Sequence, residues 1–362
     1  EGTWTVNGLA INLDEVNFVN KVKTTGEGNL YNVLNERKYL TGLVKDNVKD
    51  YYKLIGEKSE DINTIADIQA IIEEVNKNVQ DQSKIENLVK VANEGTLTQF
   101  KNAINGLGFE RVNSEWMSDY KTKIGELTTK EFTTVQNEIN KINRDKITEI
   151  YGKSDTIAKK EEVLNLINKY VKAEKKEEVD RVNEGVKVVK TEIALLKVTE
   201  AKTNATVINA LKELSNVVND KEVFSFEKLV NENLKAEYKT ALSGKEYNSV
   251  KAVKDAVVKA GNDAANKKVT EVVKAATALN DAKEEDKVAK KNELVKALEE
   301  LEIISAKNVD KFEMKNVEKV LLSEYAEELV GKTTGDEIKT EVKTVAEVKY
   351  VIETVNSSAV QK

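Results

Sequence analysis

The sequence predicts an all-α fold, arranged as an elongated array of small helical bundles built from degenerate repeats. Two observations lead to this class. Apolar residues recur at helical spacing through most of the 362 residues, whereas alternation with a period of two is rare. Short sequence patterns also return along the chain, which indicates repeated units.

The first segment, from Trp4 to Ile11, is the best candidate for a strand. Amphipathic helices are expected after it, because apolar residues fall on one stripe of a 3.6-residue period. The clearest stripes are Ile65, Ile68, Ile71, Ile72 and Val75; Phe132, Val135, Ile139 and Ile142; Val163, Leu164, Ile167 and Val171; and Val250, Val253, Val257 and Val258.

Helix starts are predicted where a hydroxyl residue is followed three positions later by an acid or an amide. This spacing lets each side chain bond an otherwise unpaired backbone N–H at a helix start. The pairs are Thr64/Asp67, Ser83/Glu86, Thr96/Gln99, Thr128/Glu131, Ser243/Glu246, Thr334/Glu337 and Thr344/Glu347. Glycines that follow apolar stretches indicate helix ends. They are Gly56, Gly125, Gly244 and Gly331.

Internal repeats are visible without gaps. The segment from Thr64 to Asn76 matches the segment from Thr344 to Asn356, and Thr156 to Asn168 fits the same frame. A looser copy runs from Thr128 to Asn140. Each copy reads as one helix of a repeated helical unit.

A second repeated feature is a tyrosine followed by a glycine. Tyr52, Tyr120, Tyr238 and Tyr325 are the copies, and we expect them to be core residues whose hydroxyl reaches the surface. They divide the chain into four helical units. The predicted units are residues 1–80, 81–145, 146–262, which holds an extra helical segment, and 263–362.

The composition excludes most familiar enzyme chemistry. The chain contains no histidine and no cysteine. It therefore has no imidazole acid or base, no Ser-His-Asp or Cys-His pair, and no zinc site built from these residues. We expect no catalytic residues and no bound cofactor. A metal site would need oxygen ligands alone, which indicates calcium or magnesium.

The charge balance disfavours nucleic acids as partners. The 57 basic residues face 63 acidic ones, so the net charge is −6 and no basic face is apparent. Only four of the basic residues are arginine. No apolar run is long enough for a membrane span, and the start of the sequence does not resemble a signal peptide.

The densest acidic stretch lies between two helical runs and supplies the candidate calcium ligands. These are Asp281, Glu284, Glu285 and Asp286. The alternative interpretation is an exposed turn or a charged helix. The chain has no EF-hand spacing, and the carboxylate pairs Glu73/Glu74 and Glu161/Glu162 are interpreted as solvated helix faces.

The segment Ile68-Gln69-Ala70-Ile71-Ile72-Glu73-Glu74-Val75-Asn76, with its copy ending in Val355-Asn356, resembles the all-helical repeats of surface-layer and other cell-wall-associated proteins of Gram-positive bacteria. The lysine bias, the acidic isoelectric point and the lack of Cys, His and Pro are similar as well. The resemblance implies assembly into a two-dimensional lattice, often with calcium. It supplies no catalytic residues, and no wall-anchoring module is recognised in this sequence.

The sequence therefore predicts a secreted, non-enzymatic structural protein of the bacterial cell surface or cell wall. As a segment of a surface-layer subunit, the chain would act as a spacer and as a lateral self-assembly element. Its main interaction would be self-association into a lattice. The alternative is an adhesin-like helical module that binds a cell-wall polysaccharide or a host ligand. Solvent-facing tyrosines would favour that alternative. A carboxylate-dependent enzyme is the third hypothesis, and no convergent set of acids identifies one.

Overall fold

The computed structural model describes residues 3–6, 9–36, 40–331, 333–334, 337–338 and 340–361. The described chain is helical apart from two short antiparallel hairpins, β1 (Thr3–Val6) with β2 (Leu9–Asn12) and β3 (Thr333–Thr334) with β4 (Glu337–Ile338). The all-α prediction is confirmed. The chain divides into two compact units, Glu1–Glu149 with Asn168–Lys172, and Ile150–Ile167 with Ala173–Lys362.

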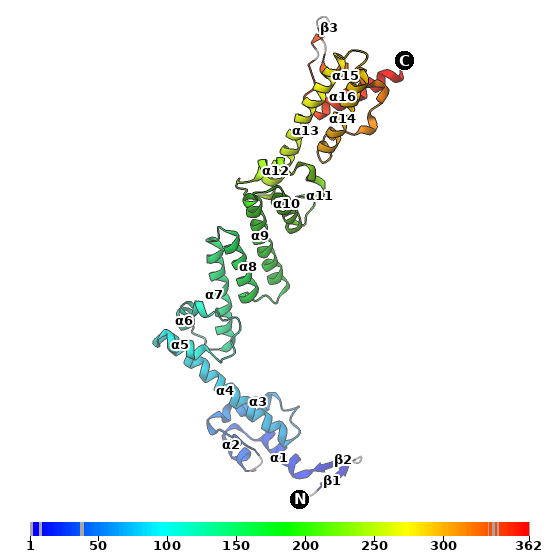
Figure 1. The fold of residues 1–362 in the computed structure, drawn as a ribbon. Helices are drawn as coiled ribbons and strands as arrows, with labels where there is room; N and C mark the ends of the chain where they lie inside the picture. The colour runs from blue at the N-terminus through cyan, green and yellow to red at the C-terminus, as the bar shows by residue number, and fades with distance from the viewer. Residues whose placement is uncertain are drawn as a thin grey trace. The chain divides into compact units, whose positions relative to one another are not determined.

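The first unit holds six complete helices and two 3-10 turns among its described residues (Figure 1). They are α1 (Leu13–Thr24), α2 (Glu27–Asn35), η1 (Lys45–Asn47), α3 (Val48–Glu57), α4 (Ile65–Glu94), α5 (Leu97–Ile104), η2 (Ser114–Trp116) and α6 (Met117–Gly125). Two further helices, α7 (Phe132–Gly152) and α8 (Ile157–Tyr170), have residues in both units.

The second unit holds the remaining helices and 3-10 turns. They are α9 (Lys176–Glu200), α10 (Asn204–Val218), α11 (Phe226–Leu229), η3 (Glu232–Leu234), α12 (Lys235–Leu242), α13 (Val250–Asn280), α14 (Lys287–Ser305), η4 (Met314–Asn316), η5 (Lys319–Leu321), α15 (Leu322–Val330) and α16 (Val345–Val360).

Helix α4 takes part in two successive hydrophobic cores. Ile68, Ile71, Ile72 and Val75, in its first half, pack into a core with α1, α2 and α3. In its second half, Ile85, Leu88, Val89 and Ala92 are buried where α4 contacts α5 and α6. Between Val75 and Ile85 the helix has no buried residue. One continuous helix therefore joins two cores in the first unit.

Helix α13 has the same role in the second unit. Val253, Val257 and Ala260 belong to the core formed with α9, α10 and α12. From Ala265 onward its buried residues belong to the next core, formed with α14, α15 and α16. Figure 1 shows α13 as one uninterrupted helix. Because burial of these apolar faces is the main source of helix stability in water, each half of α13 is stabilised by a different core.

The predicted boundaries after residues 80, 145 and 262 lie inside α4, α7 and α13. In α4 and α13 they fall between the residues of one core and those of the next. The helical backbone continues through these points, so a boundary between cores is not a break in the chain's secondary structure. The four predicted units themselves stay predictions.

The helix-start pattern was correct at three of its seven sites. Thr64 and Thr96 form reciprocal capping boxes with Asp67 and Gln99, and Thr344 accepts a bond from the Glu347 N–H. The other four predictions were wrong. The pair Ser83/Glu86 lies in the interior of α4. Helix α7 begins only after Thr128/Glu131, and α13 begins only after Ser243/Glu246. The pair Thr334/Glu337 lies in the β3–β4 hairpin. The motif describes one turn only, whereas burial of an apolar face decides where a helix runs.

A proline between the two cores of α4 tests whether the helix couples them. Asp81 is exposed and lies between Val75 and Ile85. We expect Asp81→Pro to cost about 3 kcal/mol or more, because proline removes a helical N–H and clashes with the preceding turn. Denaturant unfolding should change from one transition for this part of the chain to two. The control Asp81→Ala, which keeps the helix, should unfold like the unmodified chain.

Candidate functional site

The most specific arrangement of polar groups is a buried tyrosine that recurs four times. Each tyrosine lies on a short helix that follows a 3-10 turn, and each is at most 1% exposed. The four are Tyr51 on α3, Tyr120 on α6, Tyr238 on α12 and Tyr325 on α15. We call the turn, this tyrosine helix and the long helix that follows it a tyrosine repeat. The four repeats are numbered in chain order.

Each tyrosine hydroxyl accepts a hydrogen bond from the backbone N–H seven residues earlier. The donors are Val44 at 3.1 Å, Asn113 at 3.1 Å, Asn231 at 2.9 Å and Glu318 at 2.9 Å. These four donors are the N-cap residues of η1, η2, η3 and η5. The hydroxyl therefore holds the start of the turn that leads into its own helix.

In three repeats the same hydroxyl donates to an asparagine on the next helix. Tyr51 donates to Asn76 Oδ1 at 2.5 Å, Tyr120 donates to Asn143 Oδ1 at 2.5 Å, and Tyr325 donates to Asn356 Oδ1. Each asparagine Nδ2 then donates to the backbone carbonyl two residues before the turn's N-cap. These acceptors are Gly42 at 2.6 Å, Arg111 at 2.9 Å and Asn316 at 2.8 Å. We call this closed set of bonds the Tyr-Asn clamp.

The clamp pairs groups whose burial without partners would be costly. Asn143 and Tyr120 are both 0% exposed. The asparagine amide also donates to the carbonyl of Tyr170 at 3.1 Å. A buried donor or acceptor without a partner costs about 1–3 kcal/mol, so the clamp satisfies these groups and fixes the loop against the helix. This is a structural constraint rather than a reactive centre.

The third repeat has no Tyr-Asn clamp. Asn76 and Asn356 each lie twelve residues beyond the N-cap of their helix, and Gly261 occupies this position beyond Ser249 on α13. Glycine has no side chain to accept a bond from Tyr238. The Asn231 N–H still donates to the Tyr238 hydroxyl, so half of the arrangement is kept.

The structure corrects one tyrosine of the predicted set. Tyr120, Tyr238 and Tyr325 are the buried copies, as the sequence indicated, but in the first repeat the buried residue is Tyr51 and not Tyr52. Tyr52 is 43% exposed. The two are adjacent in the sequence, and in the structure burial and the bonds of the hydroxyl to Val44 and Asn76 distinguish them. The hydroxyls also bond to backbone N–H groups and, in three repeats, to an asparagine side chain, whereas the sequence predicted that they reach the surface.

Two expected copies of the asparagine helix differ from the structure. In α7 the clamp residue is Asn143, not Asn140, so the looser copy was three residues out of register. Asn168, which ends the copy that begins at Thr156, is exposed on α8. Thr156 nevertheless caps that helix through the Lys159 N–H at 3.2 Å. The capped helix start is therefore present in this copy, whereas the Tyr-Asn clamp is not.

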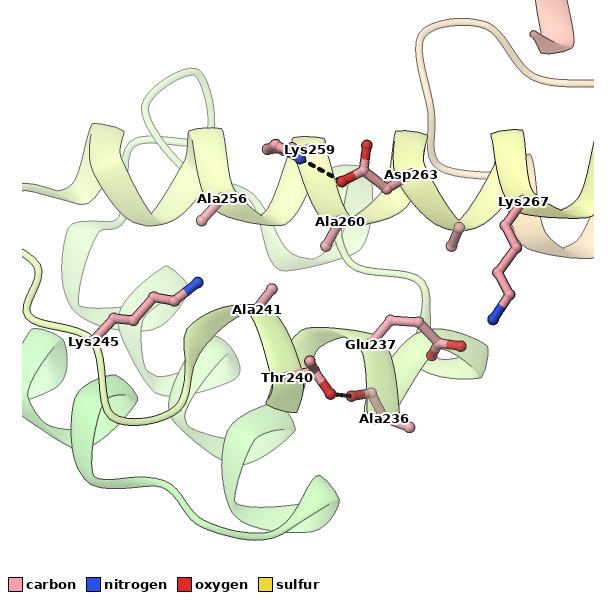
Figure 2. A pocket seen from close by; sticks show the side chains of 11 residues that line it. Ala236, Glu237, Thr240, Ala241, Lys245, Ala256, Lys259, Ala260, Asp263 and Lys267 are labelled. Atoms are coloured by element: carbon pink, nitrogen blue, oxygen red, sulfur yellow. Dashed lines mark hydrogen bonds and ion pairs between the residues drawn. The ribbon is translucent and has the colours of Figure 1, made fainter. Parts of the chain in front are cut away.

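A shallow groove lies beside the clamp position of the third repeat (Figure 2). Its volume is about 550 Å³, and α12 and α13 form its two sides. Figure 2 shows Ala256 and Ala260 of α13 facing Ala241 of α12, with Lys245 at one end and Glu237 and Lys267 at the other. Small residues make the floor, and charged side chains make the rim.

The same position is hollow in two other repeats. A groove of about 620 Å³ between α3 and α4 is lined by Leu54, Val75 and Val79, and one of about 630 Å³ along α16 is lined by Val351 and Val355. In the second repeat Lys146 of α7 reaches Asp119 of α6 at 3.2 Å. This ion pair connects the two helices that would form the sides of the groove.

The candidate calcium ligands do not converge. Asp281, Glu284, Glu285 and Asp286 are exposed between α13 and α14. Glu284 pairs with Lys287, and this contact holds the pKa of the Glu284 carboxyl below its ordinary value. Across the described residues, no three acidic side chains are grouped so that they could hold a metal ion.

Acidic pairs expected to be solvated faces have separate, local partners. Glu73 accepts a bond from Gln69 at 2.9 Å, and Glu74 pairs with Lys58 at 2.6 Å. A partly enclosed ion pair joins Lys160 and Glu192 at 2.7 Å, with the Tyr151 hydroxyl donating to the same carboxylate at 2.6 Å. That bond is the main cause that raises the pKa of Tyr151 to about 12. Lys160, Glu192 and Tyr151 thus connect α7, α8 and α9 to one another.

Comparisons with protein-family models, curated proteins and solved structures find no match. Within the described ranges, every helix is too short or too polar to cross a membrane.

Removing the clamp hydroxyl should destabilise the fold. We expect Tyr120→Phe to lower the free energy of unfolding by about 1–3 kcal/mol, because the Asn113 N–H and the Asn143 oxygen lose a buried partner. Denaturant unfolding measures this change. The matched control is Tyr52→Phe, which alters an exposed hydroxyl and should change stability by less than about 0.5 kcal/mol. Equal effects of the two substitutions would contradict a special role for the clamp.

Alkaline pH should weaken the clamps of the second and fourth repeats. Burial raises the pKa of Tyr120 to about 12 from 10.0, and it also raises the pKa of Tyr325. Because the unfolded tyrosine loses its proton first, the contribution of these two tyrosines to stability should be constant below pH ~10 and fall as the pH approaches 12. For Tyr120 alone the loss is about 2–3 kcal/mol. Unfolding curves over this range, with Tyr120→Phe as the control that loses part of the dependence, provide the measurement.

Proposed function

We propose that the chain is a non-enzymatic structural segment of a bacterial surface layer. In this role it spaces neighbouring parts of the lattice and makes lateral contacts with other copies, outside the cell and at the cell wall. The observation that carries the proposal is that α4 and α13 are each shared by two successive cores. A shared helix transmits load from one core to the next without a flexible loop between them.

The tyrosine repeats support a load-bearing role over a ligand-binding one. Of the four tyrosines that would form a sugar-stacking row if they faced solvent, Tyr120, Tyr238 and Tyr325 are buried, and their hydroxyls are bonded to the backbone. Tyr52 is 43% exposed, and the buried copy in its repeat is Tyr51. One partly exposed ring does not make a stacking row for a polysaccharide, which favours the load-bearing role.

The charges beside the grooves support association between copies of the chain. Around the α3–α4 groove, Asp50, Glu57 and Glu86 outnumber Lys53. Around the α12–α13 groove, Lys245, Lys259 and Lys267 outnumber Glu237 and Asp263. Opposite charge excess on two faces favours contact between the first face of one copy and the second face of another, which is a head-to-tail association that continues into a lattice or filament.

Assembly of the purified chain tests the proposal. We expect ordered sheets or filaments in electron microscopy at low salt, together with increased light scattering, and weaker association at high salt because exposed charges are screened. Calcium should be included and omitted in parallel. Assembly only with calcium would assign the contacts to acidic groups such as those near Asp281. A monomer under all of these conditions would contradict lateral self-assembly by this chain.

A single charge placed in the α12–α13 groove should block that contact. Ala264 lines the groove, so Ala264→Glu puts a carboxylate on the face that would dock on the acidic α3–α4 groove, and the like charges repel. The matched control is Asn262→Glu, which adds the same side chain to an exposed position of α13 outside the groove lining. We expect Ala264→Glu alone to abolish assembly, and unfolding curves of both variants check that the fold is kept. Equal assembly of both would exclude this groove as a contact.

A further inference from the structure

The third repeat replaces its missing clamp with bonds to the end of α14 and to Asn308, in the segment that leads into the fourth repeat. On α13, Gly261 stands where Asn76 and Asn356 stand on α4 and α16. The space beside Gly261 is occupied by the side chain of Asn308, which follows α14. A Cβ atom at position 261 would lie 2.6 Å from Asn308 Oδ1, so only glycine fits there with Asn308 in place.

Asn308 bonds directly to the backbone of α13. Its Nδ2 donates to the Gly261 carbonyl at 3.0 Å. Gly261 belongs to the third repeat, whereas Asn308 belongs to the chain that leads into the fourth. At this position α13 is bonded by a residue that lies outside its own repeat. At the same position, α4 and α16 are bonded by the tyrosine and the loop of their own repeats.

Asn231 makes the reciprocal connection. In the second repeat the matching residue, Asn113, caps η2 by accepting from the Glu115 N–H. Asn231 caps η3 in the same way, and its Nδ2 also donates to the carbonyls of Ile303 and Ile304 at 2.7 and 3.1 Å. These carbonyls lie at the end of α14, where a helix leaves its last acceptors without helical partners.

Two further contacts strengthen the same junction. Ile304 packs against the core that contains Tyr238 and also against the core that contains Tyr325. Lys307 Nζ donates to the Glu227 carbonyl at 2.6 Å. The bonds across this junction join residues that are 47 to 80 positions apart in the sequence.

We propose that Asn231, Gly261 and Asn308 form an inter-repeat latch that makes the third and fourth repeats open as one cooperative unit. Where other repeats have a clamp within the repeat, these three residues form bonds between the third repeat and the segment that leads into the fourth. The loop of the third repeat is then released only when the end of α14 moves, and α14 is packed into the core that contains Tyr325. The latch is a property of folding and does not depend on the surface-layer proposal.

Amide hydrogen exchange of the full chain under increasing denaturant tests the latch. In the unmodified chain, amides of α12 and α15 should share one opening reaction and the same dependence on denaturant. In Asn308→Ala, α12 should exchange about tenfold faster, because a net hydrogen bond and its packing are lost, while α15 keeps its protection. Asn262→Ala is the matched control on the exposed side of α13 and should change neither helix.

Two more variants separate the latch from general destabilisation. Asn231→Asp keeps the oxygen that caps η3 but removes the donors to Ile303 and Ile304, so it should uncouple α12 from α15 as Asn308→Ala does. The double substitution Gly261→Asn with Asn308→Gly makes room for a Tyr-Asn clamp in the third repeat. We expect it to restore the protection of α12 while leaving its opening independent of α15.

Three results would overturn the latch. One is separate opening of α12 and α15 in the unmodified chain. Another is equal acceleration of both helices in Asn308→Ala and Asn262→Ala. The third is a double variant in which α12 and α15 still open together, because that variant lacks the Asn308 side chain on which the proposed coupling depends.

Discussion

The fold depends on one hydroxyl group in each repeat. A tyrosine oxygen can accept and donate at the same time. In all four repeats it accepts from the backbone that begins its helix, and in three of them it also donates to the helix that follows. The surrounding core is apolar, and apolar burial is non-directional. The hydrogen bonds of the hydroxyl are directional, so they fix which turn of the long helix packs against which loop. The ion pairs on the surface are mostly local and exposed, and such pairs contribute little to stability.

Clamps and shared helices have complementary effects. A clamp holds a loop to a helix within one repeat, and a shared helix continues from that repeat into the next core. At the junction of the third and fourth repeats these roles merge, because Asn308 of the following segment bonds the helix at Gly261. Polar bonds specify the geometry, and apolar burial on both halves of α4 and α13 supplies most of the stabilisation.

Much of the fold could be predicted from periodicity, because an apolar stripe reports directly which helix face is buried. The segment from Thr64 to Asn76 was located correctly, including its cap. Register was harder to predict. Tyr51 and Tyr52 are adjacent on one helix, and the sequence does not show which of them faces the core. Asn143 lies one turn beyond the predicted Asn140. The exchange of clamp for latch depends on Asn308, which is distant in sequence, and no local pattern connects it to Gly261. The grooves were not predicted, because they require two helices to be placed side by side.

The continuity of α4 has a consequence for how such a chain tolerates length changes. One residue inserted between Val75 and Ile85 would turn the second set of apolar residues by about 100° and move it by about 1.5 Å along the axis. A loop would absorb the same insertion, since loop length has a small energetic effect. The exposed middle of α4 thus tolerates many helix-forming residues but is fixed in length. The number of residues in this stretch fixes the rotation of the second apolar stripe relative to the first about the helix axis. Only insertions that add close to a whole number of helical turns keep that rotation.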